Sequence, residues 1–276
     1  MARLFGLIGN RPDLAGRVLG LESEALCART RGSALGWGLG FYQGGEVLMR
    51  RRPIDDREEI QLDKLAADVR ADVLIGHVRS ATVGALRTEN THPFRYRQWL
   101  FAQTGTLGQF DTIRERLLAS VPEFLRGNVR GETDSEIFFH VFLSFLHDAG
   151  RLDNGSVTAE AVKDALRSSL AVVDGMEAEV GEGAEKTNLL VSNGDLIAGV
   201  HRNVKMSYRV YSGKNDADMI LGDDPALRRR VPDQSHMHFT LLASDFDEDL
   251  PARWKPIPMN AVVTMTRSDA PTIEAL

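Results

Sequence analysis

Hydrophobic and polar positions alternate along much of the first hundred residues, which is the pattern of β-strands with one buried face. The alternation predicts strands at residues 4–8, 73–78 and 99–102. Residues 37–41 and 47–51 surround the sequence Gln-Gly-Gly, and they predict a β-hairpin because glycine can take the positive φ of a tight turn. The first part of the chain is therefore expected to form a sheet.

The middle of the chain has helical spacing instead, with apolar residues recurring every three or four positions. Helices are predicted to begin near residues 110, 137 and 158. Residues 174–186 are acidic and rich in glycine, a composition that favours a solvated loop. Asn193-Gly194 predicts a type I′ hairpin turn between two of the later strands. These later strands are expected at 188–192, 196–201, 208–211, 238–243 and 261–266.

The order of these elements indicates the fold class. Strands do not alternate with helices, which argues against a parallel, doubly wound sheet and favours antiparallel sheets with helices packed outside them, an α+β fold. No internal repeat is present, and the only linker-like stretch is the acidic segment 174–186. One domain over residues 1–276 is expected.

Composition narrows the function classes. A net charge of -6 and an isoelectric point near 5.7 give no general attraction to nucleic acid or to an anionic membrane. Cys27 is the only cysteine, so the chain cannot form an internal disulfide, and nothing indicates an oxidising compartment. The first residues lack the apolar run of a signal peptide, and no window has the length of a membrane span. We expect a cytoplasmic protein with neither nucleic-acid nor membrane partners.

Two charged residues suggest a site for a free amino acid. Arg79 follows the predicted strand at 73–78, so it would emerge at the strand end, where a guanidinium can pair with a carboxylate through two N–H groups. Asp134 lies in the Thr-Asp-Ser-Glu segment 133–136, directly before an apolar helix. That segment also has the form of a capping box, which explains it by structure alone. Taken as a pair, Arg79 and Asp134 complement the carboxylate and the ammonium group of an amino acid.

The histidines give little sign of metal or acid–base chemistry. His92 lies in the segment Asn-Thr-His-Pro-Phe at 90–94. A histidine beside proline in a turn is more often a hydrogen-bonding fixture than a catalyst, so we interpret His92 as a structural or rim residue. The seven histidines are scattered, without the spacing of metal ligands. The sequence predicts no metal and no cofactor.

Four segments, in order, resemble the class II glutamine amidotransferases, a branch of the N-terminal-nucleophile (Ntn) hydrolases. They are the opening Met-Ala-Arg-Leu-Phe-Gly, His-Val-Arg-Ser-Ala-Thr at 77–82, and the segments at 90–94 and 133–136. The resemblance implies the Ntn-hydrolase fold, a four-layer αββα sandwich of two antiparallel sheets. It also implies that Arg79 binds the α-carboxylate and Asp134 the α-ammonium of a glutamine-like molecule. Thr82 and His92 would lie in or beside the same pocket.

The chain departs from the family's pattern where the reaction would occur. The family opens with Met-Cys and uses the cysteine thiol as nucleophile, whereas Ala2 carries a methyl group. The family's oxyanion turn is His-Asn-Gly, and here it reads Gln103-Thr104-Gly105. Gly105 keeps its backbone N–H, but Thr104 replaces a side-chain amide with a hydroxyl. Losing one such donor costs about a hundred- to thousandfold in rate, and losing the nucleophile costs roughly a millionfold.

These departures leave three hypotheses open. The first is a catalytically impaired family member, a pseudoenzyme, that keeps a pocket for glutamine, glutamate or a γ-glutamyl compound and senses or regulates a partner on a separate chain. The second is an active glutamine or γ-glutamyl amide hydrolase or amidotransferase in which Ala2 is an engineered replacement of cysteine. The third is a structural subunit without a small ligand. Further changes at residues 35, 103 and 104 favour natural divergence, because one engineered replacement would not alter them.

Overall fold

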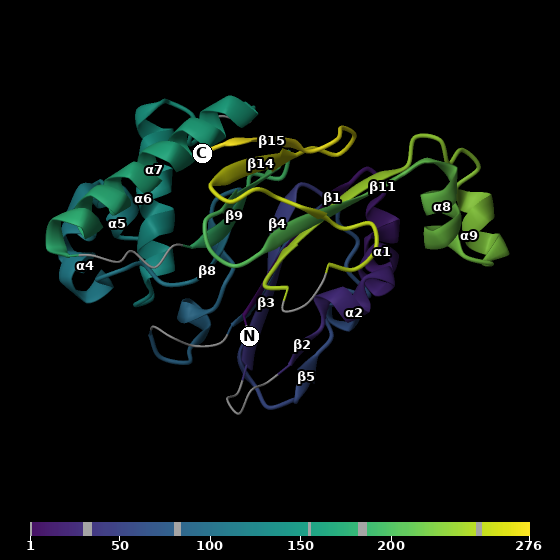
Figure 1. Cartoon of the computed structure of the whole chain (residues 1–276), viewed down its shortest axis with the longest axis horizontal. Coiled ribbons are helices and arrows are strands. Elements are labelled where there is room, and N and C mark those ends of the chain that lie inside the picture. The colour runs from purple at the N-terminus through teal and green to yellow at the C-terminus, as the bar shows by residue number, and fades with distance from the viewer. Residues whose placement is uncertain (1, 30–34, 80–83, 154–155, 182–186, 247–249) are drawn as a thin grey trace.

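Two antiparallel β-sheets face each other at the centre of the molecule (Figure 1). The computed structural model describes residues 2–29, 35–79, 84–153, 156–181, 187–246 and 250–276. The larger sheet has seven strands in the order β13-β11-β12-β1-β6-β3-β4, and the smaller has six in the order β15-β14-β10-β9-β8-β7. All of the strand pairings in the described residues are antiparallel.

The strands begin close to the positions that the alternating pattern predicts. The seven-stranded sheet consists of β1 (Arg3–Gly9), β3 (Leu35–Gln43), β4 (Glu46–Asp55), β6 (Val73–Arg79), β11 (Met206–Ser212), β12 (His238–Ser244) and β13 (Lys255–Pro256). The six-stranded sheet consists of β7 (Phe94–Tyr96), β8 (Trp99–Thr104), β9 (Asn188–Ser192), β10 (Ile197–His201), β14 (Ala261–Met265) and β15 (Thr272–Ala275). A separate pair is formed by β2 (Ala28–Arg29) and β5 (Glu59–Ile60).

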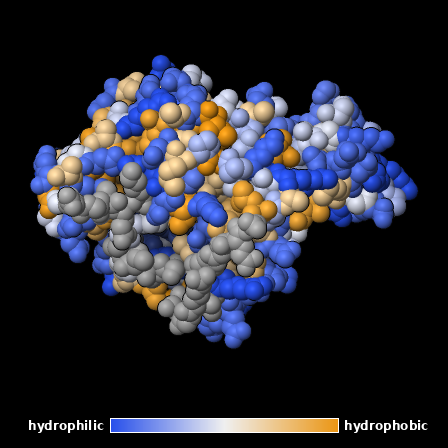
Figure 2. Space-filling model, viewed as in Figure 1, coloured by the Kyte–Doolittle hydropathy of each residue, from blue (hydrophilic) through white to orange (hydrophobic). Residues whose placement is uncertain are grey.

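Helices lie outside both sheets (Figure 1). On the side of the seven-stranded sheet are η1 (Pro12–Leu14), α1 (Ala15–Leu21), α2 (Ser23–Leu26), α3 (Leu62–Leu65), α8 (Gly213–Leu221) and α9 (Pro225–Arg230). On the side of the six-stranded sheet are α4 (Phe110–Ser120), α5 (Glu123–Arg126), α6 (Asp134–Asp148) and α7 (Ala159–Val180), and η2 (Thr88–Asn90) precedes β7. α8 and α9 project at one end, where hydrophilic residues cover most of the surface in this view (Figure 2). Among the described residues, no helix combines the length and the apolar character needed to cross a bilayer.

Three layers of apolar side chains hold the elements together. One fills the space between the two sheets, a second lies between the seven-stranded sheet and helices α1, α3 and α8, and the third lies between the six-stranded sheet and α4 to α7. In the third layer Phe101 of β8 stacks on Phe139 of α6, with the ring centroids 5.2 Å apart. Helices, sheet, sheet and helices thus form four layers, and the predicted αββα sandwich is confirmed.

The acidic loop predicted from residue 174 is wrong for its first seven residues, because α7 continues to Val180. Arginines from other segments pair with two of the three acidic side chains of this last part of the helix. Arg202 lies 2.7 Å from Asp174, and Arg116 lies 2.6 Å from Glu179. Gly181 follows the end of the helix, and residues 182–186 of the predicted loop lie outside the described residues.

The turn between β9 and β10 also differs from the prediction. A type I′ turn has two central residues, both with positive φ, whereas four residues separate these strands. Gly194 takes a φ of 93°. The side-chain oxygen of Asn193 accepts the N–H groups of Asp195 and Leu196 at 3.0 and 3.2 Å, so asparagine closes the turn through its side chain.

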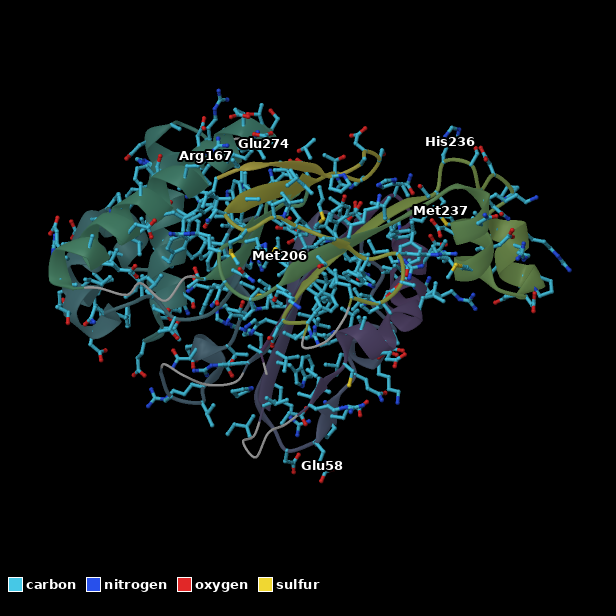
Figure 3. All side chains as sticks on the ribbon, in the orientation of Figure 1. Glu58, Arg167, Met206, His236, Met237 and Glu274 are labelled. Atoms are coloured by element: carbon cyan, nitrogen blue, oxygen red, sulfur yellow. The ribbon has the colours of Figure 1, made fainter. Side chains whose placement is uncertain are left out.

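The final strand is held against α7 by charged side chains. Figure 3 shows Arg167 of α7 beside Glu274 of β15, and their charged atoms lie 3.6 Å apart. Lys163, one helical turn earlier, lies 2.7 Å from the same carboxylate. Because β15 is the edge of its sheet, these contacts fasten an otherwise exposed strand to the helical layer.

Gly38 of β3 allows the segment 90–94 to lie directly on the seven-stranded sheet. A Cβ atom at Gly38 would stand 2.0 Å from the backbone oxygen of His92, far inside van der Waals contact. A Cβ atom at Gly20, near the end of α1, would meet no atom within 4 Å.

We expect Gly38→Ala to lower the free energy of unfolding by about 1–3 kcal/mol or more, because the added methyl group must displace backbone rather than a flexible side chain. Gly20→Ala is the matched control and should raise that free energy by about 0.5–1 kcal/mol, since alanine is the better helix former. Urea denaturation followed by circular dichroism measures both variants. A Gly38→Ala variant as stable as the control would contradict the close approach.

Candidate functional site

Strand β1 brings the start of the chain beside Arg79. β1 pairs with β6 in the register Arg3↔Val78, and β3 lies on the other side of β6 with Gly36 opposite Arg79. Ala2 directly precedes β1, and the same register continued by one residue sets it across from Arg79. Two residues far apart in the sequence therefore lie on neighbouring strands.

Alternation also gives these two residues the same direction. Leu4 of β1 and Ile75 of β6 belong to the apolar layer between the sheets. Ala2 is two positions before Leu4, and Arg79 is four positions after Ile75, so both share the face that looks toward the six-stranded sheet. The space between the ends of the two sheets is thus the place where their side chains meet.

Arg79 ends β6 and is almost fully buried, with 5% of its surface exposed. Its guanidinium donates hydrogen bonds to the backbone oxygens of Gly84 and Ala85, at 3.1 and 3.3 Å. Burial lowers the pKa of the guanidinium, and the negative charge of Asp134 acts in the opposite direction. Thr82, predicted to bind the same ligand, lies outside the described residues.

Asp134 is the first residue of α6, where the helix dipole favours a negative charge. Its carboxylate accepts the N–H of Leu107 at 2.8 Å, the hydroxyl of Ser135 at 3.3 Å and the side-chain amide of Gln103 at 3.4 Å. Burial raises the pKa of this carboxyl group, and the hydrogen bonds from Leu107 and Ser135 oppose the rise. The carboxylate is therefore held from β8, from the loop after it and from α6 itself.

The capping box predicted at this helix forms only in part. Thr133 caps α6 as expected, because its hydroxyl oxygen accepts the backbone N–H of Glu136 at 3.3 Å. The carboxylate of Glu136 turns instead to the N–H groups of Arg130 and Gly131, at 3.1 and 2.6 Å. Glu136 thereby orders the turn before the helix rather than completing the box.

The predicted oxyanion turn follows β8. Thr104 is the last residue of that strand, and Gly105 takes a φ of 88°, a left-handed conformation that favours glycine. Ala102 faces the space between the sheets, so alternation turns Thr104 to the same space as Arg79. The Thr104 hydroxyl is buried and has no hydrogen-bond partner in the part of the chain that the structure describes. Thr104 therefore presents a hydroxyl group to the space between the sheets.

His77 and His92 form a buried ring contact next to Arg79. Their centroids lie 4.4 Å apart, and Phe94 packs against His92 at 4.7 Å. All four ring nitrogens are buried without a hydrogen-bond partner among the described residues. Burial, followed by the positive charge of Arg79, lowers the pKa of His77 to about 3, and burial holds the pKa of His92 well below its usual value. Each ring shields the other from solvent, so His92 is a buried, uncharged residue and not a rim residue.

Asn90 lies in one of the four resembling segments, but the sequence pattern did not assign it a role in the site. Its side-chain nitrogen donates to the backbone oxygen of Ala85 at 2.9 Å, and its oxygen accepts the N–H of Glu132 at 2.8 Å. Ala85 is also bonded by Arg79, so Asn90 ties the turn at Arg79 to the turn before α6. An asparagine in this segment could have been expected to bond to neighbouring turns, because a buried amide needs hydrogen-bond partners. Only the fold identifies those partners.

The described residues connect most of the predicted site. Ala2 and Arg79 lie on neighbouring strands, and Asp134 is bonded by the side chain that precedes Thr104. Within the described residues, no three His, Cys, Asp or Glu side chains are grouped so as to hold a metal ion. The arrangement offers a buried cation, a buried carboxylate and an unpartnered hydroxyl, with a methyl group at residue 2.

Sequence comparisons point to one family. A family model described as class II glutamine amidotransferases matches residues 1–224, most of the chain. "Probable glutamine amidotransferase DUG3" of Saccharomyces cerevisiae is 35% identical over 89 residues, which cover 32% of this chain and 25% of that protein. Glutamine–fructose-6-phosphate aminotransferase of Streptococcus pyogenes is 27% identical over 177 residues, covering 63% of this chain and 26% of that protein. The chain spans a quarter to half of the length of the first curated relatives it matches.

Solved structures share the fold along the whole chain. A glutamine aminotransferase class-II domain protein from Silicibacter pomeroyi has a TM-score of 0.61 at 17% identity and covers 99% of this chain and 98% of that one. Glutamine phosphoribosylpyrophosphate amidotransferase from B. subtilis has a TM-score of 0.54 at 14% identity, covering 99% of this chain and 49% of that one. At these identities the likeness shows the fold alone.

The buried histidines should make the stability of the protein depend on pH. His77 and His92 are neutral in the folded protein, and unfolding returns their pKa to about 6.5, so the unfolded chain binds more protons below that pH. Above pH ~6.5 both histidines are neutral in the folded and the unfolded chain, so burying them does not lower the free energy of unfolding through any protonation cost. That free energy should decline as the pH falls toward the folded value, by up to about 1.4 kcal/mol per pH unit for each histidine.

Urea denaturation between about pH 7.5 and 4.5 tests this expectation. His77→Gln should reduce the decline by the share of one histidine, because glutamine binds no proton. His147→Gln removes an exposed histidine of α6 and is the control, which should keep the slope of the unaltered protein. Equal slopes in both variants would show that His77 is not held neutral.

Proposed function

The chain belongs to the class II glutamine amidotransferases, and we propose that it binds a glutamine-like amino acid without hydrolysing it. The ligand class is glutamine, glutamate or a γ-glutamyl compound with free α-amino and α-carboxylate groups. Arg79 pairs with the α-carboxylate, Asp134 pairs with the α-ammonium, and the side chain of the ligand extends toward residue 2 and Thr104. The observation that carries the proposal is the position of Ala2 across from Arg79. It sets an arginine that can bind a carboxylate beside a residue that has no nucleophilic group.

The charges support binding of a free amino acid. Arg79 and Asp134 carry opposite charges on separate elements, and both are buried, so they act on a ligand more strongly than charges in water would. Hydrogen bonds to the surrounding backbone already orient each of them. Every ligand of this class brings an α-carboxylate and an α-ammonium group, so it adds two pairings with opposite charges, and glutamine does so without adding net charge to a buried space.

Ala2 removes the first step of hydrolysis. In the family, the thiol of residue 2 attacks the side-chain carbonyl carbon of glutamine, ammonia leaves, and water then releases glutamate from the thioester. A methyl group forms no bond to that carbon. Thr104 and Gly105 can still donate hydrogen bonds to a side-chain oxygen of the ligand, which supports binding without turnover.

Binding without turnover suits a sensing or regulatory role toward a separate protein chain. The names of the relatives describe glutamine-dependent transfer reactions, which supports glutamine as the proposed ligand of this chain. The transfer step itself belongs to those proteins, of which this chain spans only part. A structural subunit without a ligand is the alternative, and a lack of binding would favour it.

Isothermal titration calorimetry with millimolar L-glutamine and L-glutamate tests the binding. We expect at least one of them to bind. Arg79→Met should lower that binding affinity by at least about tenfold, because a charge-assisted pairing is lost. Arg50→Met is the matched control, since Arg50 is an exposed arginine paired with Asp68 on the outer side of the sheet. No heat with either amino acid would remove the proposed pocket.

Ammonia release from glutamine tests the catalytic part of the proposal. The unaltered protein should release none, whereas Ala2→Cys should release ammonia at a measurable rate because it restores the nucleophile. Adding Thr104→Asn should raise that rate by about a hundredfold or more, since it restores an oxyanion donor. Ala2→Ser/Thr104→Asn, with a weaker nucleophile, is the control. Ammonia release by the unaltered protein would contradict catalytic impairment.

A further inference from the structure

Gln103 lies where the end of β8 meets the start of α6. We propose that Gln103 is a positioning residue for the Asp134 carboxylate and the second acceptor for the ligand's ammonium group, so that the site selects a primary amine. The ligand half of this inference rests on the proposed function. The carboxylate half concerns the protein by itself.

The strand places a polar amide where apolar side chains are otherwise expected. Trp99 and Phe101 of β8 belong to the apolar layer beneath α6, and Gln103 is the next residue on that face. Gln103 is buried, with 1% of its surface exposed. Its side-chain nitrogen lies 3.4 Å from Oδ2 of Asp134, the same oxygen that accepts the N–H of Leu107. The amide therefore reaches the Asp134 carboxylate at the start of α6.

The chemistry of the two groups decides which way the amide points. An ionised carboxylate only accepts hydrogen bonds, so the nitrogen of Gln103 faces Asp134 and the oxygen faces away from it. That oxygen, Oε1, is buried without a hydrogen-bond partner among the described residues. Buried acceptors without partners are rare in proteins. An ammonium group has three N–H donors and can bond to the carboxylate and to this oxygen together.

The charges around Asp134 give the positioning a measurable effect. The positive charge of Arg79, at the end of β6, interacts favourably with the ionised form of Asp134, while Glu136 on α6 adds a second carboxylate that is bonded to the turn before the helix. Burial raises the pKa of Asp134. Removing the N–H donor of Gln103 takes away one hydrogen bond that favours the ionised form, so the pKa should rise further. Gln103 itself does not titrate, so any change in the titration of this site is that of Asp134.

Carbon-13 NMR of the aspartate carboxyl groups tests the carboxylate half in the full chain without ligand. The Asp134 signal is assigned with Asp134→Asn, and its titration is followed in Gln103→Met, which keeps the length of the side chain without its donor. We expect the pKa of Asp134 to rise by at least about half a unit. Gln98→Met is the matched control, because Gln98 donates to the backbone of Leu152, and it should cause no shift. An unchanged titration in Gln103→Met would overturn the positioning role.

Affinity for L-glutamate and for glutarate, which lacks the amino group, tests the ligand half. Gln103→Met should lower the affinity for L-glutamate by at least about tenfold and the affinity for glutarate by less than about twofold. Equal loss for both would indicate a merely structural role and overturn the selection of a primary amine. If the unaltered protein binds neither compound at millimolar concentration, the proposed function fails together with the ligand half, and the NMR titration still decides the carboxylate half. Gln103→Leu serves for both measurements if Gln103→Met does not fold.

Discussion

The register of β1 is the constraint on which the rest of the site depends. The strand lies between β12 and β6 in the seven-stranded sheet, and its side chains fill the apolar layers on both faces. A slip of one residue would turn every side chain to the opposite face, so the register is strongly specified. On the outer face, Arg3 donates to the backbone oxygens of Ser244 and Cys27, at 2.9 and 3.2 Å. These contacts fix the start of β1, so that residue 2, which directly precedes it, lies across from Arg79.

Burial of polar groups explains why the turns around the site are joined to one another. Each buried group needs a partner, and most of the available partners are backbone atoms of neighbouring turns. Arg79 and Asn90 both bond to Ala85, Asn90 also bonds to Glu132, and Glu136 orders the residues just before that position. The binding groups are therefore supported by a continuous set of hydrogen bonds. These bonds order the side chains in advance and reduce the conformational entropy that ligand binding would cost.

Binding and reaction depend on different segments of this fold. The charged groups proposed to hold an amino acid come from the end of β6 and the start of α6, whereas the proposed reacting position is residue 2 and the proposed oxyanion donors lie at and just after the end of β8. A thiol contributes little to holding the two charged ends of an amino acid, so in the proposed function a methyl group at residue 2 is compatible with binding through Arg79 and Asp134. This separation is the physical basis of the proposed binding without turnover.

The sequence by itself determined the strands of alternating pattern, the apolar helix capped by Thr133 and, through four short segments, the family and its layered fold. Periodicity reports which face of an element is apolar, and that information is local. The tertiary structure alone decided that α7 extends through acidic residues, because Arg116 and Arg202 come from other segments. It also decided that His92 is buried and that Gln103 reaches Asp134. Such contacts join residues with no regular spacing between them, so only the folded arrangement of strands and helices specifies them.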